Sequence, residues 1–272
     1  MKKSINILLL VVVVLVGVLA LVGCGKDKEK EIVVGATPSP HAEILNSDVV
    51  QNYVKSKGYT LVVKVYQDYV TPNKALNDGG LDANYFQHIP YLEQEISEKG
   101  YEIEAVATVH NEPLNLYGKT KVSDYQDLTI SIINDVENAE RAFKLLKAIG
   151  AIDAYDVTDY NAQHPVYTSS KNVTIECIAE GLLSKKVDEG GYAIIPGNFA
   201  LTAWGATKAT EYKVVGESTE VAYPNIIACR KSDVKSEKIN VLVEALGQKE
   251  VADFIANTYG STVSSQYADL RK

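Results

Sequence analysis

The sequence predicts an α/β protein with largely parallel sheets, divided into two lobes. Short apolar segments rich in β-branched residues alternate with segments whose apolar residues recur at helical spacing. This alternation is typical of chains that form parallel sheets covered by helices. About 249 residues follow the N-terminal leader, which exceeds the usual size of one domain. Two lobes, each with its own core, therefore suit the length, and no internal repeat is visible.

The first elements are predicted from periodicity and from helix-end signals. Glu31–Ala36 and Thr60–Tyr66 are predicted strands, because they are rich in β-branched residues and partly alternate. Ser39-Pro40 predicts the start of a helix between them, and Gly58 predicts its end. The apolar residues that give this segment its helical spacing are Ile44, Leu45, Val49, Tyr53 and Val54.

The same reasoning predicts the later elements. Ala139–Ile149 is a predicted helix closed by Gly150. The other predicted strands are Leu128–Ile133, Tyr192–Ile195 and Asn225–Cys229, and the last predicted helices are Lys238–Leu246 and Glu250–Tyr259. In a two-lobed chain, the crossings between lobes are expected near Ala107–Leu116 and near Tyr223–Arg230.

The N-terminus predicts a lipoprotein signal peptide over residues 1–23. The basic Lys2-Lys3 precedes an apolar run from Ile7 to Val22, which is the pattern of a secretory signal. A transmembrane anchor is the alternative, but about sixteen helical residues span only about 24 Å, short of the roughly 30 Å hydrocarbon core. Leu21-Val22-Gly23-Cys24 resembles the bacterial lipobox, so we expect acylation, such as palmitate, at Cys24. Residues 24–31 are then a solvated tether on the extracytoplasmic side of a bacterial cell membrane.

Charge and cysteine content exclude several classes of function. Loss of Lys2 and Lys3 with the signal takes the formal charge from −8 to −10, and no basic cluster follows the tether, so a nucleic-acid partner is not expected. Cys177 and Cys229 are too far apart in sequence for a zinc or redox motif. They are either buried free thiols or a disulfide. Met1 is the only methionine, so the mature chain contains none.

Motifs for catalysis and for metal binding are also missing. The sequence contains no GxSxG elbow, no P-loop and no GxGxxG after a strand, so we expect no catalytic residues and no cofactor. Its four histidines form no HxH or HExxH pair, and we predict no metal site. Three distant histidines and a carboxylate could still converge in space. The histidines are His41, His88, His110 and His164.

Polar and aromatic residues gather at the ends of predicted segments. Asp68–Asn73 directly follows a predicted strand, where ligand sites of α/β proteins are found. The segment Asp82–His88 combines two aromatic rings, an amide and an imidazole. Each asparagine taken alone is more typical of a turn or cap than of a ligand contact. As a set, these residues indicate a site. The other members are Asn134, Asn138, Arg141, Asn198 and Asn225.

Seven motifs resemble those of the methionine-binding lipoproteins (MetQ/NlpA-like), and they occur in order over essentially the whole mature chain. The runs DYVTPNKAL from Asp68 and LDANYFQH from Leu81 carry most of the specificity. The other motifs are Thr37–Leu45, His110–Pro113, Asn138–Ala142, Gly197–Ala200 and Asn225–Ala228.

The resemblance implies a periplasmic-binding-protein-like (Venus flytrap) fold with the ligand in a cleft between the lobes. It implies residues 32–113 as the first part of lobe 1, residues 114–224 as lobe 2, and residues 225–272 as the return to lobe 1 with C-terminal helices. Arg141 would bind the ligand carboxylate, because a guanidinium offers the two-pronged contact that a lysine does not. Asn198 and Asn225 would bond the amino and carboxylate groups, while Tyr69, Phe86 and His88 would surround a thioether.

The implied function is capture of methionine, as either enantiomer or within a peptide, by a monomer that delivers it to the permease and ATPase of an ABC importer. Three departures from the family pattern border the implied site and leave the ligand side chain open. The alternatives are another small amino acid, a metal ion, and a surface sensor or adhesin; an enzyme is the remaining class. The departures are Ile133-Asn134-Asp135, Ile195-Pro196-Gly197-Asn198 and the asparagine in His110–Asn115.

Overall fold

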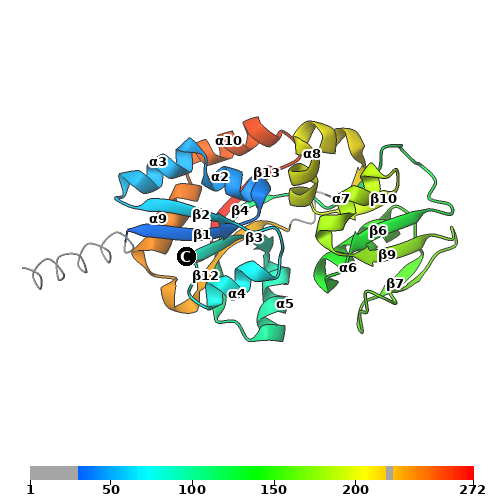
Figure 1. Cartoon of the computed structure of the whole chain (residues 1–272), viewed down its shortest axis with the longest axis horizontal. Helices are drawn as coiled ribbons and strands as arrows, with labels where there is room; N and C mark the ends of the chain where they lie inside the picture. Colours follow the sequence, from blue (N-terminus) through cyan, green and yellow to red (C-terminus); the bar gives the residue numbers. More distant parts are fainter. Residues whose placement is uncertain (1–29, 219–222) are drawn as a thin grey trace, which may run out of the picture.

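The molecule consists of two lobes, each built on its own β-sheet (Figure 1). The computed structural model describes residues 30–218 and 223–272. The predicted signal peptide, Cys24 and nearly all of the tether lie outside these residues. Within the described part of the chain, no helix combines the length and apolar character that crossing a membrane requires.

The first lobe is a six-stranded sheet in which β1, β2 and β3 are parallel and β12 runs antiparallel to β3 and β4. Its strands, in spatial order, are β13 (Ser264–Asp269), β4 (Ile103–Asn111), β12 (Asn225–Arg230), β3 (Ala83–His88), β1 (Glu31–Ala36) and β2 (Thr60–Val65). Its helical segments are η1 (Pro38–Ala42), α2 (Glu43–Leu45), α3 (Asp48–Ser56), α4 (Thr71–Asn77), α5 (Ile89–Lys99), the short η2 (Lys231–Asp233), α9 (Glu237–Leu246) and α10 (Lys249–Tyr259).

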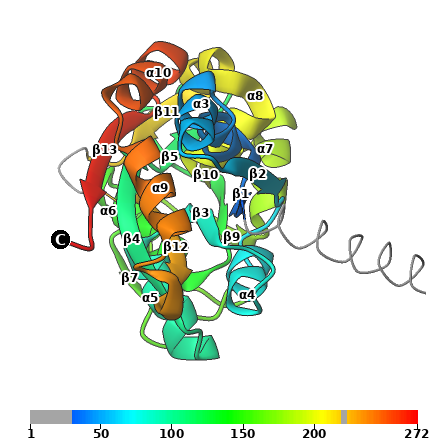
Figure 2. The ribbon, with the colours of Figure 1, turned by 90° about the vertical axis from the view of Figure 1, so that its left-hand side faces the viewer.

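Helices cover both faces of this first sheet. On one face, α3, α9 and α10 pack against strand residues such as Ile32 and Ile227. On the other face, α4 and α5 pack against Ile226 and Ala228. Successive residues of β12 thus point to opposite sides, as the pleat requires, and both sides are buried. Figure 2 shows α9 lying across the first sheet, with α4 and α5 at the opposite end of the view from α10.

The second lobe is a five-stranded sheet, with a small hairpin of β7 (Ala154–Asp156) and β8 (Val166–Thr168) beside it. Its strands, in spatial order, are β11 (Lys213–Gly216), β5 (Asn115–Tyr117), β10 (Tyr192–Ile195), β6 (Thr129–Ile133) and β9 (Thr174–Ile178). Its helices are α6 (Val136–Ala148), α7 (Glu180–Asp188) and α8 (Gly197–Tyr212). The neighbouring strands β10, β6 and β9 are parallel, with β9 at the edge of the sheet.

The chain passes between the lobes twice. It leaves the first sheet where β4 ends at Asn111 and enters the second where β5 begins at Asn115. This crossing lies inside the predicted stretch Ala107–Leu116. The return runs between Gly216 and Asn225. The prediction of Tyr223–Arg230 for the return was therefore mostly wrong, because β12 occupies nearly all of that stretch as a central strand.

Local prediction failed most clearly between β1 and β2. The single helix expected from Ser39 to Gly58 is interrupted, because Ser39 has extended backbone angles and the chain bends again before α3. Ser47 is the N-cap of α3: its hydroxyl oxygen accepts a hydrogen bond from the backbone N–H of Val50. Helical spacing on both sides of this break concealed it, since Ile44 and Val54 face the same core.

The remaining elements agree with expectation to within a few residues, and β1 and β10 match it fully. The helix expected over Ala139–Ile149 begins earlier, at Val136, because the Asp135 carboxylate accepts a hydrogen bond from the Asn138 N–H and caps it. The two cysteines are free thiols, Cys177 half-buried on β9 and Cys229 buried on β12.

Candidate functional site

A pocket lies between the two lobes, at the ends of strands from both sheets. About 330 Å³ in the pocket and its mouth, open solvent included, is not filled by protein atoms. All six residues expected to bind the ligand line it, contributed by the loop after β2 and by β3, α6, α8 and β12. The lining residues are Tyr69, Phe86, Gln87, His88, Tyr91, Glu112, Asn138, Arg141, Pro196, Gly197, Asn198 and Asn225.

Arg141 forms the positively charged end of the pocket. Its Nε and Nη2 donate hydrogen bonds to the two carboxylate oxygens of Glu217, at 3.0 and 2.7 Å, in a two-pronged ion pair. Its Nη1 donates to Oδ1 of Asn138 at 3.2 Å, and the Tyr223 ring lies 4.1 Å from the guanidinium carbon. A guanidinium has five N–H groups, so these contacts leave two of them for a ligand.

Helix α6 positions Arg141 through its N-terminal cap. Asp135 accepts hydrogen bonds from both the backbone and the side-chain nitrogen of Asn138, at 2.9 and 3.1 Å. Asn138 lies one turn before Arg141, so its oxygen reaches the guanidinium. Burial raises the pKa of Asp135 to about 6, against the opposing effects of the Asn138 hydrogen bonds and the Arg141 charge.

Side chains of the two lobes meet directly across the pocket. The Tyr69 hydroxyl donates to Oδ1 of Asn198 at 2.7 Å, and Nε2 of His88 donates to Oδ1 of Asn138 at 3.1 Å. The Tyr69 ring also meets Phe199 with 5.1 Å between centroids. Burial lowers the pKa of His88 to about 3, and the Arg141 charge adds to this shift, so its imidazole is neutral at physiological pH. These contacts describe a closed arrangement of the lobes.

Aromatic rings form one wall of the pocket. The Tyr69 ring lies 5.6 Å from Phe86 and 5.8 Å from Tyr91, measured between centroids. The Tyr91 hydroxyl donates to the backbone oxygen of Tyr69 at 3.2 Å, which fixes the loop after β2. An apolar, polarisable group would be well matched to this wall, because sulfur and aromatic rings attract one another.

A buried amide network supports this side of the pocket. Gln87 lines the pocket, and its side-chain carbonyl accepts from Asn73 while its amide nitrogen donates to Asn73 and Asn84. The polar and aromatic residues of the segment Asp82–His88 therefore have two different roles. Phe86 and His88 face the ligand space, and Asn84 and Gln87 bind the start of α4.

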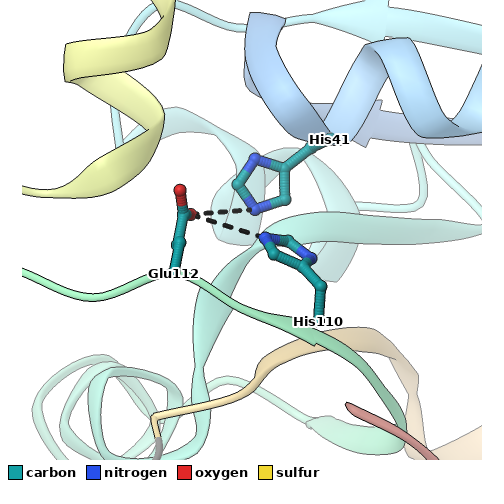
Figure 3. Close-up of side chains that lie close together, drawn as sticks. All are labelled: His41, His110 and Glu112. Atoms are coloured by element: carbon teal, nitrogen blue, oxygen red, sulfur yellow. Dashed lines mark ion pairs between the residues drawn. The ribbon is translucent and has the colours of Figure 1, made fainter. Parts of the chain in front are cut away.

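His41, His110 and Glu112 lie close together (Figure 3), and of these three Glu112 lines the pocket. Oε1 of Glu112 lies 3.7 Å from Nε2 of His41 and 3.6 Å from Nε2 of His110. His41 Nε2 also lies 2.9 Å from Oδ1 of Asn225, and its Nδ1 lies 2.8 Å from the Thr37 hydroxyl. Tyr85 is hydrogen-bonded to Nδ1 of His110. Local spacing gave no sign of this convergence, since the strands of the first sheet create it.

Within this cluster, Glu112 is the member that titrates near neutral pH. Burial lowers the pKa of His41 to about 4 and that of His110 to about 3, so both imidazoles are neutral near pH 7. Burial also raises the pKa of Glu112 to about 7, with the nearby His41 and Arg141 acting in the opposite direction. The other two histidines are elsewhere: His88 bonds Asn138, and His164 is exposed in a loop of the second lobe.

Sequence reasoning missed several residues of the site. Asn138 was included in the polar set that indicates a site but was not among the residues expected to bind the ligand, and Glu112 stood inside a motif quoted for the resemblance without being singled out. Tyr91 lies just beyond the segment Asp82–His88, on the next helix. Glu217 had no sequence signal, because it reaches Arg141 only through the pairing of β11 with β5.

Known proteins are similar to this chain over nearly its whole length. Residues 32–266 match the family model described as NlpA lipoprotein. A Bacillus subtilis protein named methionine-binding lipoprotein MetQ is 39% identical over 244 residues, covering 86% of this chain and 88% of that protein.

Two solved structures are informative for the site. A nutrient-binding protein from Burkholderia cenocepacia, bound to methionine, superposes with a TM-score of 0.77 at 28% identity, covering 86% of this chain and 99% of that one. A periplasmic substrate-binding protein of an ABC transporter from Coxiella burnetii superposes with a TM-score of 0.76 at 25% identity, covering 86% and 100%.

Proposed function

Because the chain belongs to the NlpA lipoprotein family, we propose that it captures methionine outside the cytoplasmic membrane and delivers it to an ABC importer. The observation that carries this proposal is the pocket itself. One guanidinium with two free N–H groups lies opposite a wall of three aromatic rings, and a relative of the same fold has been solved with methionine bound.

Arg141 binds the ligand carboxylate in this proposal. Glu217 occupies its Nε and Nη2 from the side, so the two remaining N–H groups, one on each terminal nitrogen, are left for a carboxylate. Each charge-assisted hydrogen bond contributes about 1.5–3 kcal/mol. Asn198 and Asn225 stand on opposite lobes and offer further polar contacts.

Tyr69, Phe86 and His88 bind the ligand side chain. Two of these are aromatic rings in contact, and His88 is held neutral by burial, so none of them presents a charge to the ligand. A thioether gains about 0.3–1.5 kcal/mol from each favourable sulfur–aromatic contact. This environment selects methionine, as either enantiomer, over amino acids with charged side chains.

Binding is coupled to closure of the lobes. We assign residues 32–113 and 225–272 to lobe 1 and residues 114–224 to lobe 2, and the distribution of the strands over two sheets supports this assignment. The bonds from Tyr69 to Asn198 and from His88 to Asn138 form only when the lobes meet. The closed form then docks the permease, and a lipid on Cys24 holds the monomer at the extracytoplasmic side of the membrane. The protein binds and does not catalyse.

The test is to identify what the protein carries. Freshly purified protein is denatured, and the released small molecules are analysed by mass spectrometry; the refolded, ligand-free protein is then titrated calorimetrically with L-methionine, D-methionine and glycyl-methionine. We expect one equivalent of methionine or a methionine-containing peptide, and saturable rebinding. Release of a different amino acid, with no heat on adding any of the three compounds, would overturn the proposal.

A further inference from the structure

Glu112 is a buried carboxylate in the wall of the pocket, placed on the crossing between the lobes. It directly follows β4, and its side chain is 6% exposed. Its two oxygens have different surroundings. Oε1 faces the Nε2 atoms of His41 and His110, whereas Oε2 has no hydrogen-bond partner among residues 30–218 and 223–272. Figure 3 shows this second oxygen turned away from both rings.

Oε2 lies against the first residue of α8, Gly197. A Cβ built on Gly197, which lines the pocket, would lie 2.8 Å from Oε2 of Glu112. Gly197 is followed by Asn198, whose side chain faces the same space. The absence of a side chain at Gly197 therefore lets α8 pack closely against Glu112, and both residues line the pocket.

A buried carboxylate without a donor is costly, and its neighbours do not remove the cost. Both imidazoles beside Oε1 are neutral, since burial lowers the pKa of each. Their Nε2 atoms also lie beyond hydrogen-bond distance of Oε1. A cationic donor arriving with the ligand would supply what the protein does not.

We propose that Oε2 of Glu112 binds the α-ammonium group of the ligand, opposite the carboxylate bound by Arg141. This inference rests on the function proposed above and deepens it. The pocket then recognises a zwitterion at both ends, and its substrates are amino acids or short peptides with a free amino group. A compound that has no free amino group leaves Oε2 without a partner and is rejected.

An ammonium suits this position better than a metal ion does. His41, His110 and Glu112 are residue types that bind zinc, and their ligating atoms all lie within 4.8 Å of one another. Two atoms of the cluster lack a hydrogen-bond partner among the described residues, Nε2 of His110 and Oε2 of Glu112; a metal between the rings would use Nε2 and Oε1 and would leave Oε2 without one. His41 Nε2 is already engaged with Asn225 at 2.9 Å.

The experiment compares Glu112→Gln with the wild type in calorimetric titrations. The probes are L-methionine and 4-(methylthio)butanoate, which is methionine without its amino group. We expect the wild type to prefer methionine by about 100-fold or more, because a charge-assisted bond and an ion pair are lost with the amine. In Glu112→Gln we expect methionine affinity to fall about 10- to 100-fold, with the affinity for the analogue changed less than about threefold.

Glu95→Gln is the matched control. Glu95 is a buried carboxylate of α5, 4% exposed, whose Oε2 also lacks a hydrogen-bond partner among the described residues, but it does not line the pocket. It should leave both affinities unchanged, and thermal unfolding of both variants reports whether they fold.

Three other results are distinguishable. Equal discrimination by Glu112→Gln and the wild type would overturn the ammonium assignment while leaving methionine binding intact. Binding of one equivalent of Zn²⁺ that requires His110 and Glu112, with no loss of methionine affinity in Glu112→Gln, would assign the carboxylate to a metal and overturn it too. Failure of the wild type to bind methionine would instead count against the proposed function.

Discussion

The two charged ends of the pocket are built in opposite ways. At one end, Arg141 is held by Glu217, Asn138 and the Tyr223 ring. At the other, Glu112 keeps an oxygen for which the described residues provide no donor. The difference follows from acid–base chemistry. A guanidinium cannot lose its proton, so the protein must supply a permanent counter-ion. A buried carboxylate can take up a proton, so it can be neutral when no cation is bound.

Removing the guanidinium is expected to have the largest effect. Arg141→Ala loses the N–H groups proposed to bind the ligand carboxylate, and it leaves Glu217 largely buried without its counter-ion. We expect methionine affinity to fall by about 3 kcal/mol or more, which is at least about 150-fold. We also expect the free energy of unfolding to fall by about 3–5 kcal/mol. Calorimetry and urea denaturation measure the two effects.

A double variant separates them. In Arg141→Ala with Glu217→Ala, no buried charge is left unpaired, so stability should largely return while affinity stays low. If the single variant bound methionine as tightly as the wild type, the assignment of Arg141 to the carboxylate would be wrong.

Crowding Gly197 should damage the Glu112 end alone. The added methyl group of Gly197→Ala would lie 2.8 Å from Oε2 of Glu112 and 2.9 Å from its Cβ, so the carboxylate must move. Such overpacking costs about 1–3 kcal/mol, and we expect a loss of affinity of about tenfold or more in calorimetry.

The control for this substitution is Gly181→Ala on α7, where a Cβ meets no atom within 4 Å. It should bind methionine like the wild type. Equal losses in the two variants would show that the effect of Gly197→Ala comes from helix changes in general and not from displacement of Glu112.

The sequence predicted only part of the Arg141 and Glu112 ends of the pocket. Strand patterns and helix caps were enough to locate β1, β10 and most of α6, because those signals are local. The six expected residues meet in one pocket because they stand at strand ends or in the first turns of the helices that follow. Glu217 lies 76 residues after Arg141, and nothing near it in the sequence indicates that the return of the chain brings the two together.

The sequence did not predict a role for Glu112 for a different reason. It stood inside a quoted motif, but its pairing with His41 and His110 depends on β4 lying two strands from β3 and three from β1, with β12 between. The wrong prediction of a single helix over residues 39–58 also comes from tertiary structure that the local sequence does not show. Tertiary packing of Ile44 and Val54 on one core fixes their spacing, whether or not the backbone between them is one helix.

Protonation of Glu112 should change methionine affinity reversibly and by less than the substitutions above. Burial raises the pKa of Glu112 to about 7, and a bound ammonium would lower it, so binding releases a proton. Affinity should therefore rise with pH up to about 7 and level off above it, by about tenfold between pH 6 and pH 8. Calorimetry in buffers of different ionisation enthalpy measures the released proton.

The other groups that face Glu112 do not titrate in this window. Burial lowers the pKa of both neighbouring imidazoles to about 4 or below and raises the pKa of the four neighbouring tyrosines. Asp135, at the other end of the pocket, has a pKa of about 6 and contributes only at the acidic limit. A flat profile for Glu112→Gln is expected, and a profile as steep as that of the wild type would contradict the assignment. The groups that interact electrostatically with Glu112 include His41, His110, Tyr69, Tyr85, Tyr117, Tyr259 and Arg141.

The smallest effect is expected from an uncharged contact between the lobes. Tyr69→Phe removes the hydroxyl that donates to Asn198 at 2.7 Å and keeps the ring that packs on Phe86. One neutral hydrogen bond contributes about 0.5–1.5 kcal/mol, so methionine affinity should fall about two- to tenfold. Tyr53→Phe is the control, because its hydroxyl donates to the exposed Glu244 on the surface of the first lobe. If Tyr69→Phe cost no more affinity than Tyr53→Phe, the bond to Asn198 would not help to hold the lobes together, and closure would depend on the charged ends.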